Sequence, residues 1–186
     1  MQFSKGMLHD LKSVARLSSR KDWEYAGKLD IQQKKGKLVY KGITYHTSER
    51  NDGVDADVIK VAWDGPLTYH THPCPMEGFH TSLPSDADFK TYIKGHPRLW
   101  TNLVCDRDGF YVVRLTDPTA LPLPHVVQDT MTDMRAEPFL WTRRVNHDGR
   151  EYFKTNPEEW KEFVNHDMHP RLMDRFGISL EYWDYY

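Results

Sequence analysis

The chain contains 186 residues, of which 39% are hydrophobic, 28% charged and 13% aromatic, so it can bury a core as one domain, or one domain with an appendage. The formal net charge of −2 at pH 7 offers no basic surface to nucleic acid or to an anionic membrane. No apolar run approaches the roughly 18 residues of a membrane span, and the two cysteines suit a reducing compartment, so we expect a soluble, cytoplasmic protein.

Helix and strand signals alternate through the first half of the chain. Apolar residues at helical spacing from Phe3 to Leu17 predict an amphipathic first helix. Sequence runs typical of strands follow at residues 23–32, 37–47, 58–63 and 66–73. The KKGK sequence at Lys34–Lys37 predicts the turn between the first two strands, and a polar loop at residues 48–57 precedes the third.

The second half of the chain also contains both helix and strand signals. Phe89, Tyr92 and Ile93 predict a short helix that begins near Ser85 and is ended by Gly95. Further signals predict two strands, at residues 100–106 and 109–117, and two helices, at residues 125–137 and 158–168. This mixture predicts an α+β fold, or α/β with a mixed sheet flanked by helices. We expect one core, residues 1–118, with a mainly helical, aromatic-rich extension at residues 119–186 packed on it.

The sequence YHTHP at residues 69–73 indicates a metal site. Alternation along a strand points His70 and His72 to the same face, with Thr71 on the other face. Two imidazoles so placed can converge on one ion, and zinc accepts imidazole nitrogen and carboxylate oxygen. A histidine pair of this kind is by itself weak support, because half-buried sheets also tolerate histidines.

A carboxylate for the same site is available at the start of the next predicted helix. In the sequence SDAD at residues 85–88, Asp88 is the candidate third ligand and Asp86 a rival. The alternative interpretation is a capping box, in which Ser85 caps the helix and Asp88 occupies its third position. The two roles are compatible, since a capped helix holds its acid rigidly. Three protein ligands would leave a fourth zinc position for water, as in catalytic sites.

Together with an upstream glutamate, these residues resemble a known motif. Glu24, then the HxHP sequence at residues 70–73, then Ser85 and Asp88 resemble the JAMM motif of the MPN+ (JAB1/MPN/Mov34) metalloprotease family. The order and the predicted supporting elements match that pattern. The resemblance covers residues 23–116, about half of the chain, and implies an MPN-like domain.

The resemblance also implies a role for each residue. His70, His72 and Asp88 would bind one zinc ion per chain, Glu24 would act as general base, and Ser85 would stabilise the tetrahedral intermediate. A glutamate on a polar strand face is otherwise usually solvated. The implied function is that of a zinc metalloprotease or isopeptidase, deubiquitinase-like, whose protein substrate is a conjugate of ubiquitin or a ubiquitin-like protein.

The chain departs from the family pattern between its metal-binding elements. Residues 74–84 form a longer connection than is usual in the family, so we expect an enlarged loop at the rim of the site. Cys74 and His80 lie in this loop and could approach zinc as an inhibitory fourth ligand, although a small apolar residue and a surface histidine are the simpler interpretations. His166 and His169 are interpreted as a histidine pair at a helix end.

The aromatic residues of the C-terminal region support a second hypothesis. Such residues usually complete a core, but an exposed set would form a protein interface. The protein could then be a structural or scaffold subunit of a larger assembly, including a capsid, with a virion location and little or no catalysis. The aromatic residues in question are Phe139, Trp141, Tyr152, Phe153, Trp160, Phe163, Phe176, Tyr182, Trp183, Tyr185 and Tyr186.

Overall fold

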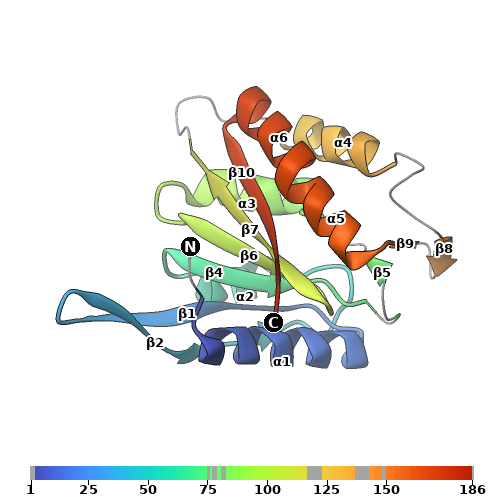
Figure 1. Cartoon of the computed structure of the whole chain (residues 1–186). Coiled ribbons are helices and arrows are strands. Elements are labelled where there is room, and N and C mark those ends of the chain that lie inside the picture. Colours follow the sequence, from blue (N-terminus) through green and yellow to red (C-terminus); the bar gives the residue numbers. More distant parts are fainter. Residues whose placement is uncertain are drawn as a thin grey trace.

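One mixed sheet organises the fold (Figure 1). The computed structural model describes residues 3–74, 76, 79–80, 83–116, 123–136, 143–147 and 150–185. Within them, the strand order is β10-β7-β6-β4-β1-β2, β3 pairs with β1, and the β4–β6 pair is parallel. The strands are β1 (Tyr25–Lys34), β2 (Lys37–Ile43), β3 (His46–Thr47), β4 (Leu67–Thr71), β6 (Thr101–Cys105), β7 (Gly109–Leu115) and β10 (Ile178–Asp184).

Helices cover both faces of this sheet, so the chain is a single α+β domain, as predicted. Leu11 of the first helix packs with Leu103 of β6 on one face, whereas the next sheet residue, Val104, packs with the remaining helices on the other. The helices are α1 (Lys5–Lys21), α2 (Ala56–Ala62), α3 (Asp86–Gly95), α4 (Pro124–Arg135), α5 (Pro157–Phe163), the π-helical turn η2 (Val164–Met168) and α6 (His169–Phe176). None of the helices described is long and apolar enough to cross a bilayer.

Both predicted hairpins and the first two predicted helices are confirmed. The β1–β2 hairpin turns at Lys35 and Gly36, whose φ angles of 50° and 76° match the left-handed conformation that a tight hairpin turn requires. The β6–β7 hairpin closes through backbone N–H groups of Asp108 and Gly109 that donate to the Asp106 carboxylate. The predicted amphipathic first helix is α1, and the helix predicted after Ser85 is α3.

The strand predicted at residues 58–63 is wrong, because these residues lie in and just after helix α2. Ile59, Ala62 and Trp63 contact the core at helical spacing, while Val61 is 60% exposed. The β-branched residues favour a strand locally, but a short helix buries Trp63 and Ala62 on the same side. Tertiary packing therefore overrides the local preference.

The C-terminal region contains the two predicted helices, as α4 and as α5 continued by η2, and it also contains strands that were not predicted. Strand β10 pairs along its whole length with β7, so it forms an edge of the main sheet, and α4, α5 and α6 pack against one face. Eight of its aromatic side chains are described, and none of them is exposed, which indicates that they complete the core. They are Tyr152, Phe153, Trp160, Phe163, Phe176, Tyr182, Trp183 and Tyr185.

A small second sheet joins the enlarged loop to the C-terminal region. Strand β5 (Phe79–His80) pairs antiparallel with β9 (Arg150–Lys154), which pairs with β8 (Arg143–His147). Tyr152 of β9 packs with Cys74. The loop between the predicted metal-binding elements is thus partly a structural element.

Candidate metal centre

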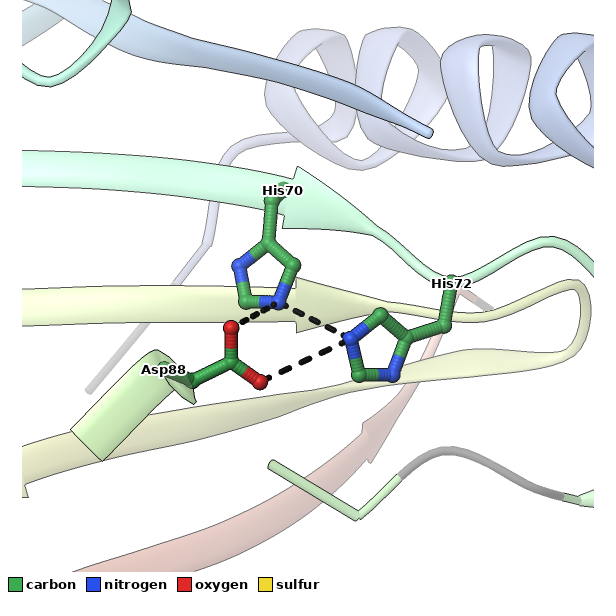
Figure 2. Close-up of side chains that lie close together, drawn as sticks. All are labelled: His70, His72 and Asp88. Atoms are coloured by element: carbon green, nitrogen blue, oxygen red, sulfur yellow. Dashed lines mark hydrogen bonds and ion pairs between the residues drawn. The ribbon is translucent and has the colours of Figure 1, made fainter. Parts of the chain in front are cut away.

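Strand β4 presents two imidazoles to one face of the sheet. His70 lies within β4, and the backbone N–H of His72 donates to the Cys105 carbonyl at 2.9 Å, which continues the strand geometry for one more step. The two Nε2 atoms consequently lie 3.0 Å apart (Figure 2). Thr71 points to the other face, where its hydroxyl donates to Ser18 at 2.7 Å.

Helix α3 brings a carboxylate to the same point. Asp88 Oδ1 lies 3.2 Å from His70 Nε2, and Oδ2 lies 3.6 Å from His72 Nε2. The capping box is also present, because Asp88 Oδ2 accepts from the backbone N–H and hydroxyl of Ser85 at 2.7 and 2.8 Å. The cap uses Oδ2, so Oδ1 can ligate an ion while the cap stays intact. Capping and metal binding are therefore compatible here.

The donor atoms fit a divalent ion such as zinc. Bonds of about 2.0 to 2.2 Å in tetrahedral geometry require ligand atoms about 3.3 Å apart. The separations from His70 Nε2, 3.0 Å to His72 Nε2 and 3.2 Å to Asp88 Oδ1, are close to this value. His72 Nε2 lies 3.6 Å from the other carboxylate oxygen, Oδ2. Among the residues described, these three form a group close enough to hold a metal ion.

Electrostatics favour the ionised carboxylate that ligation requires. Burial alone would raise the pKa of Asp88, but the adjacent imidazoles of His70 and His72 outweigh it and hold this pKa well below its ordinary value. Asp88 is thus an anion at neutral pH, ready to neutralise part of the charge of a cation.

Glu24 lies beside the ligands. The antiparallel β1–β4 register pairs Ala26 with His70, and Glu24 lies two residues before Ala26, the spacing at which side chains on an extended chain share a face. Its backbone N–H donates to the Arg50 carbonyl at 2.7 Å, which fixes the entry into the strand. Glu24 and His72 also line the same two cavities.

Ser85 lies at the edge of the same group. Its hydroxyl donates to Asp88 Oδ2 at 2.8 Å and accepts from the Asp88 backbone N–H at 3.2 Å. The side chain also lines both cavities. A hydroxyl held in this way can donate to a bound substrate only after its proton turns away from Asp88.

Two adjoining cavities flank the ligand group. The larger, of about 360 Å³, and the smaller, of about 130 Å³, share Glu24, Asp52, His72 and Ser85. Asp52 belongs to the polar loop at residues 48–57 and pairs with Arg50 at 2.9 Å. That loop is therefore one wall of the cleft.

Helix α4 supplies the far wall of the larger cavity, which sequence reasoning missed. Four of its residues share one helical face at the spacing i, i+3, i+4 and i+7. They are Gln128, Met131, Thr132 and Arg135. Three of the four are polar and lie beside the buried apolar residues of the helix, which is the signal that could have indicated a cleft wall. Asn102, a polar residue within the buried strand β6, was also missed.

The rival ligands contact other groups. Asp86 forms an ion pair with Lys90 at 2.6 Å. The Cys74 thiol donates to the Met76 carbonyl at 3.2 Å, and burial raises the pKa of this thiol to about 12, so it is a protonated packing residue. The His80 side chain lies outside the described residues. His169 Nδ1 lies 3.0 Å from the Leu180 carbonyl oxygen, and exposed His166 lies near Glu162.

Comparisons with protein-family models and with curated proteins found no match to this chain. The resemblance to the JAMM motif therefore stays a prediction. It is carried by the positions of Glu24, His70, His72, Ser85 and Asp88.

Proposed function

We propose that this protein is a zinc-dependent hydrolase of peptide or isopeptide bonds. The observation that carries the proposal is the convergence of His70, His72 and Asp88, with Glu24 lining the same two cavities as His72. Two imidazoles and one carboxylate form a ligand set typical of catalytic zinc. When bound, zinc would supply Lewis acidity for activating water and polarising a carbonyl.

Glu24 is the proposed proton carrier. Its carboxylate takes a proton as water adds to the carbonyl carbon, then delivers that proton to the nitrogen as the carbon–nitrogen bond breaks. The products are a carboxylate and an amine. This role suits Glu24 because it borders the cleft without belonging to the three-residue ligand group.

Ser85 is the proposed donor to the carbonyl oxygen. Negative charge develops on that oxygen during addition of water, and a fixed hydroxyl is an appropriate partner. The capping box at the start of α3 holds Ser85 next to Asp88. Donation to substrate requires the hydroxyl to exchange its bond to Asp88 for one to the carbonyl oxygen.

The shape of the cleft suits a bond within a longer chain. Because the cavities adjoin at Glu24, His72 and Ser85, a substrate can extend away from the ligand group on both sides. The larger cavity has room for a side chain of the substrate against α4. We propose a ubiquitin-like conjugate as substrate because the motif resembles the JAMM pattern.

Metal analysis followed by a hydrolysis assay tests the proposal. We expect one zinc per chain, cleavage of a ubiquitin-like conjugate from a broad panel, loss of cleavage with chelator and recovery with zinc. Folded protein that binds no zinc would contradict the proposal at its first step. Zinc-loaded protein that cleaves nothing would favour the structural-subunit hypothesis instead.

A further inference from the structure

A buried asparagine joins the metal centre to the middle of the sheet. Asn102 of β6 is 3% exposed and lies next to Thr68 in the parallel β4–β6 register. Its amide nitrogen donates to Thr68 Oγ1 at 2.7 Å. Its amide oxygen lies 3.2 Å from His70 Nδ1 and accepts from the Tyr92 hydroxyl at 2.9 Å.

This arrangement determines which nitrogen of His70 carries the proton. A carbonyl oxygen only accepts hydrogen bonds, so His70 must donate from Nδ1 to Asn102 Oδ1. In a neutral imidazole the other nitrogen, Nε2, then holds a lone pair. Nε2 is the atom that faces His72 and Asp88.

Tyr92 and Thr68 hold the amide in this orientation. Tyr92 follows Asp88 by four residues on α3, so one helical face carries both a proposed ligand and the hydroxyl that contacts Asn102. Tyr92 is 4% exposed, so its hydroxyl lies in the interior beside Asn102. Thr68 Oγ1 accepts a hydrogen bond from the amide nitrogen of Asn102, so the amide oxygen faces His70.

We propose that Asn102 is a positioning residue for the metal centre, which fixes His70 in the Nδ1–H tautomer and thereby presents Nε2 to the ion. The inference rests on the proposed zinc site. Partners of this type orient metal-binding histidines, and their loss typically lowers metal affinity about 10- to 100-fold.

Two substitutions at this position separate the role of the oxygen from the role of the amide nitrogen. Asn102→Leu keeps a similar volume and removes the acceptor, so we expect zinc affinity, measured by competition with a chelator, to fall about 10- to 100-fold. Asn102→Asp keeps an oxygen facing His70 and should restore affinity to within a few-fold of the wild type. The cobalt affinities of the three proteins should follow the same order. The absorption spectrum of the cobalt-loaded protein should change only for Asn102→Leu.

A matched control tests for simple destabilisation. Asn165 is half-buried and bridges to β10 by exchanging two hydrogen bonds with the Tyr182 backbone, in a different part of the molecule. Asn165→Leu should lower the denaturation midpoint and leave zinc affinity unchanged. Equal zinc affinity in Asn102→Leu and wild type would overturn the proposal, as would an Asn102→Asp variant as weak as Asn102→Leu.

The tautomer can be measured without any metal. Long-range proton–nitrogen NMR spectra of the metal-free protein should show a proton on His70 Nδ1, whether or not the Asp88 carboxylate, 3.2 Å from Nε2, draws a second proton to that atom. A His70 ring protonated on Nε2 alone would overturn the role of Asn102. If the wild type bound no zinc but showed the Nδ1–H tautomer, the zinc function would fail while the orientation of His70 by Asn102 would stand.

Discussion

The two sides of the candidate metal centre are built in different ways. On the ligand side, His70 and His72 are two residues apart along one strand direction, and Asp88 is three residues after the cap that begins α3. On the opposite side, the larger cavity is closed by α4 and by Tyr152 of β9, which are distant in sequence. The chemical groups thus depend on local geometry, whereas the space for a substrate depends on the packing of distant segments.

This difference makes the two sides experimentally separable. Variants on the ligand side should change zinc binding or turnover. Variants on the α4 wall should change substrate affinity while zinc stays bound, since the wall residues of α4 lie outside the ligand group.

Removing one ligand should have the largest effect. Loss of a residue that only orients a metal-binding histidine typically lowers metal affinity about 10- to 100-fold. We expect the zinc affinity of His72→Ala to fall by more than this, and hydrolysis to disappear with it. Zinc content after dialysis and turnover are the measurements. Asp86→Ala is the matched control, because Asp86 pairs with Lys90 and should leave zinc in place. Loss of zinc in the control alone would identify Asp86 as the ligand.

Glu24 tests chemistry on the ligand side without removing the ion. Glu24→Gln should keep zinc and fold, and should reduce turnover about 10²- to 10⁴-fold with substrate affinity largely retained, because general acid–base catalysis contributes that much. Steady-state kinetics and metal analysis on the same samples provide the comparison. Undiminished turnover would exclude Glu24 from the reaction, and zinc loss would instead indicate a ligand.

Asp88 belongs to the candidate metal centre and also contributes to folding stability, and this contribution depends on pH. Because the pKa of Asp88 is held well below its ordinary value, its stabilisation is full above the unfolded pKa of about 3.9 and is lost as the pH falls through the lower folded pKa. In metal-free protein, Asp88→Ala should lower the free energy of unfolding by about 1.5 to 3 kcal/mol above that range, as for hydrogen bonds to a charged group.

The measurement for Asp88 is a series of denaturant titrations from about pH 6 to about pH 2. The difference between wild type and Asp88→Ala should shrink toward the acidic end. A difference that stays constant over the whole series would show that the carboxylate is not stabilised by its neighbours.

A substitution in the α4 wall should have the smallest effect and should separate substrate binding from zinc binding most clearly. Thr132→Phe would fill part of the larger cavity, so we expect KM to rise about tenfold, near the lower end of what a misfit in a pocket costs, with zinc content unchanged. The matched control is Asp133→Phe, an exposed neighbour that does not line the cavity. Equal effects of both variants would show that the cavity does not receive substrate.

Short-range patterns explain what could be predicted from the sequence. The alternation in YHTHP predicted that His70 and His72 would share a face, and the spacing in SDAD predicted both the cap and the position of Asp88. These predictions succeed because strand and helix periods fix side-chain directions over a few residues. They do not test the catalytic roles of Glu24 and Ser85, which stay predictions.

Tertiary packing decided what the sequence patterns could not. Residues 58–63 form helix α2 because Trp63 and Ala62 must be buried on one side, and β10 joins the main sheet because β7 offers it a complete edge. The contacts of Asn102 with His70 and Tyr92 connect three different elements, so no local period could predict them. Local sequence thus determined which residues could hold a metal ion, and long-range packing determined the orientation of His70 and the shape of the cleft, since both depend on residues far apart in the chain.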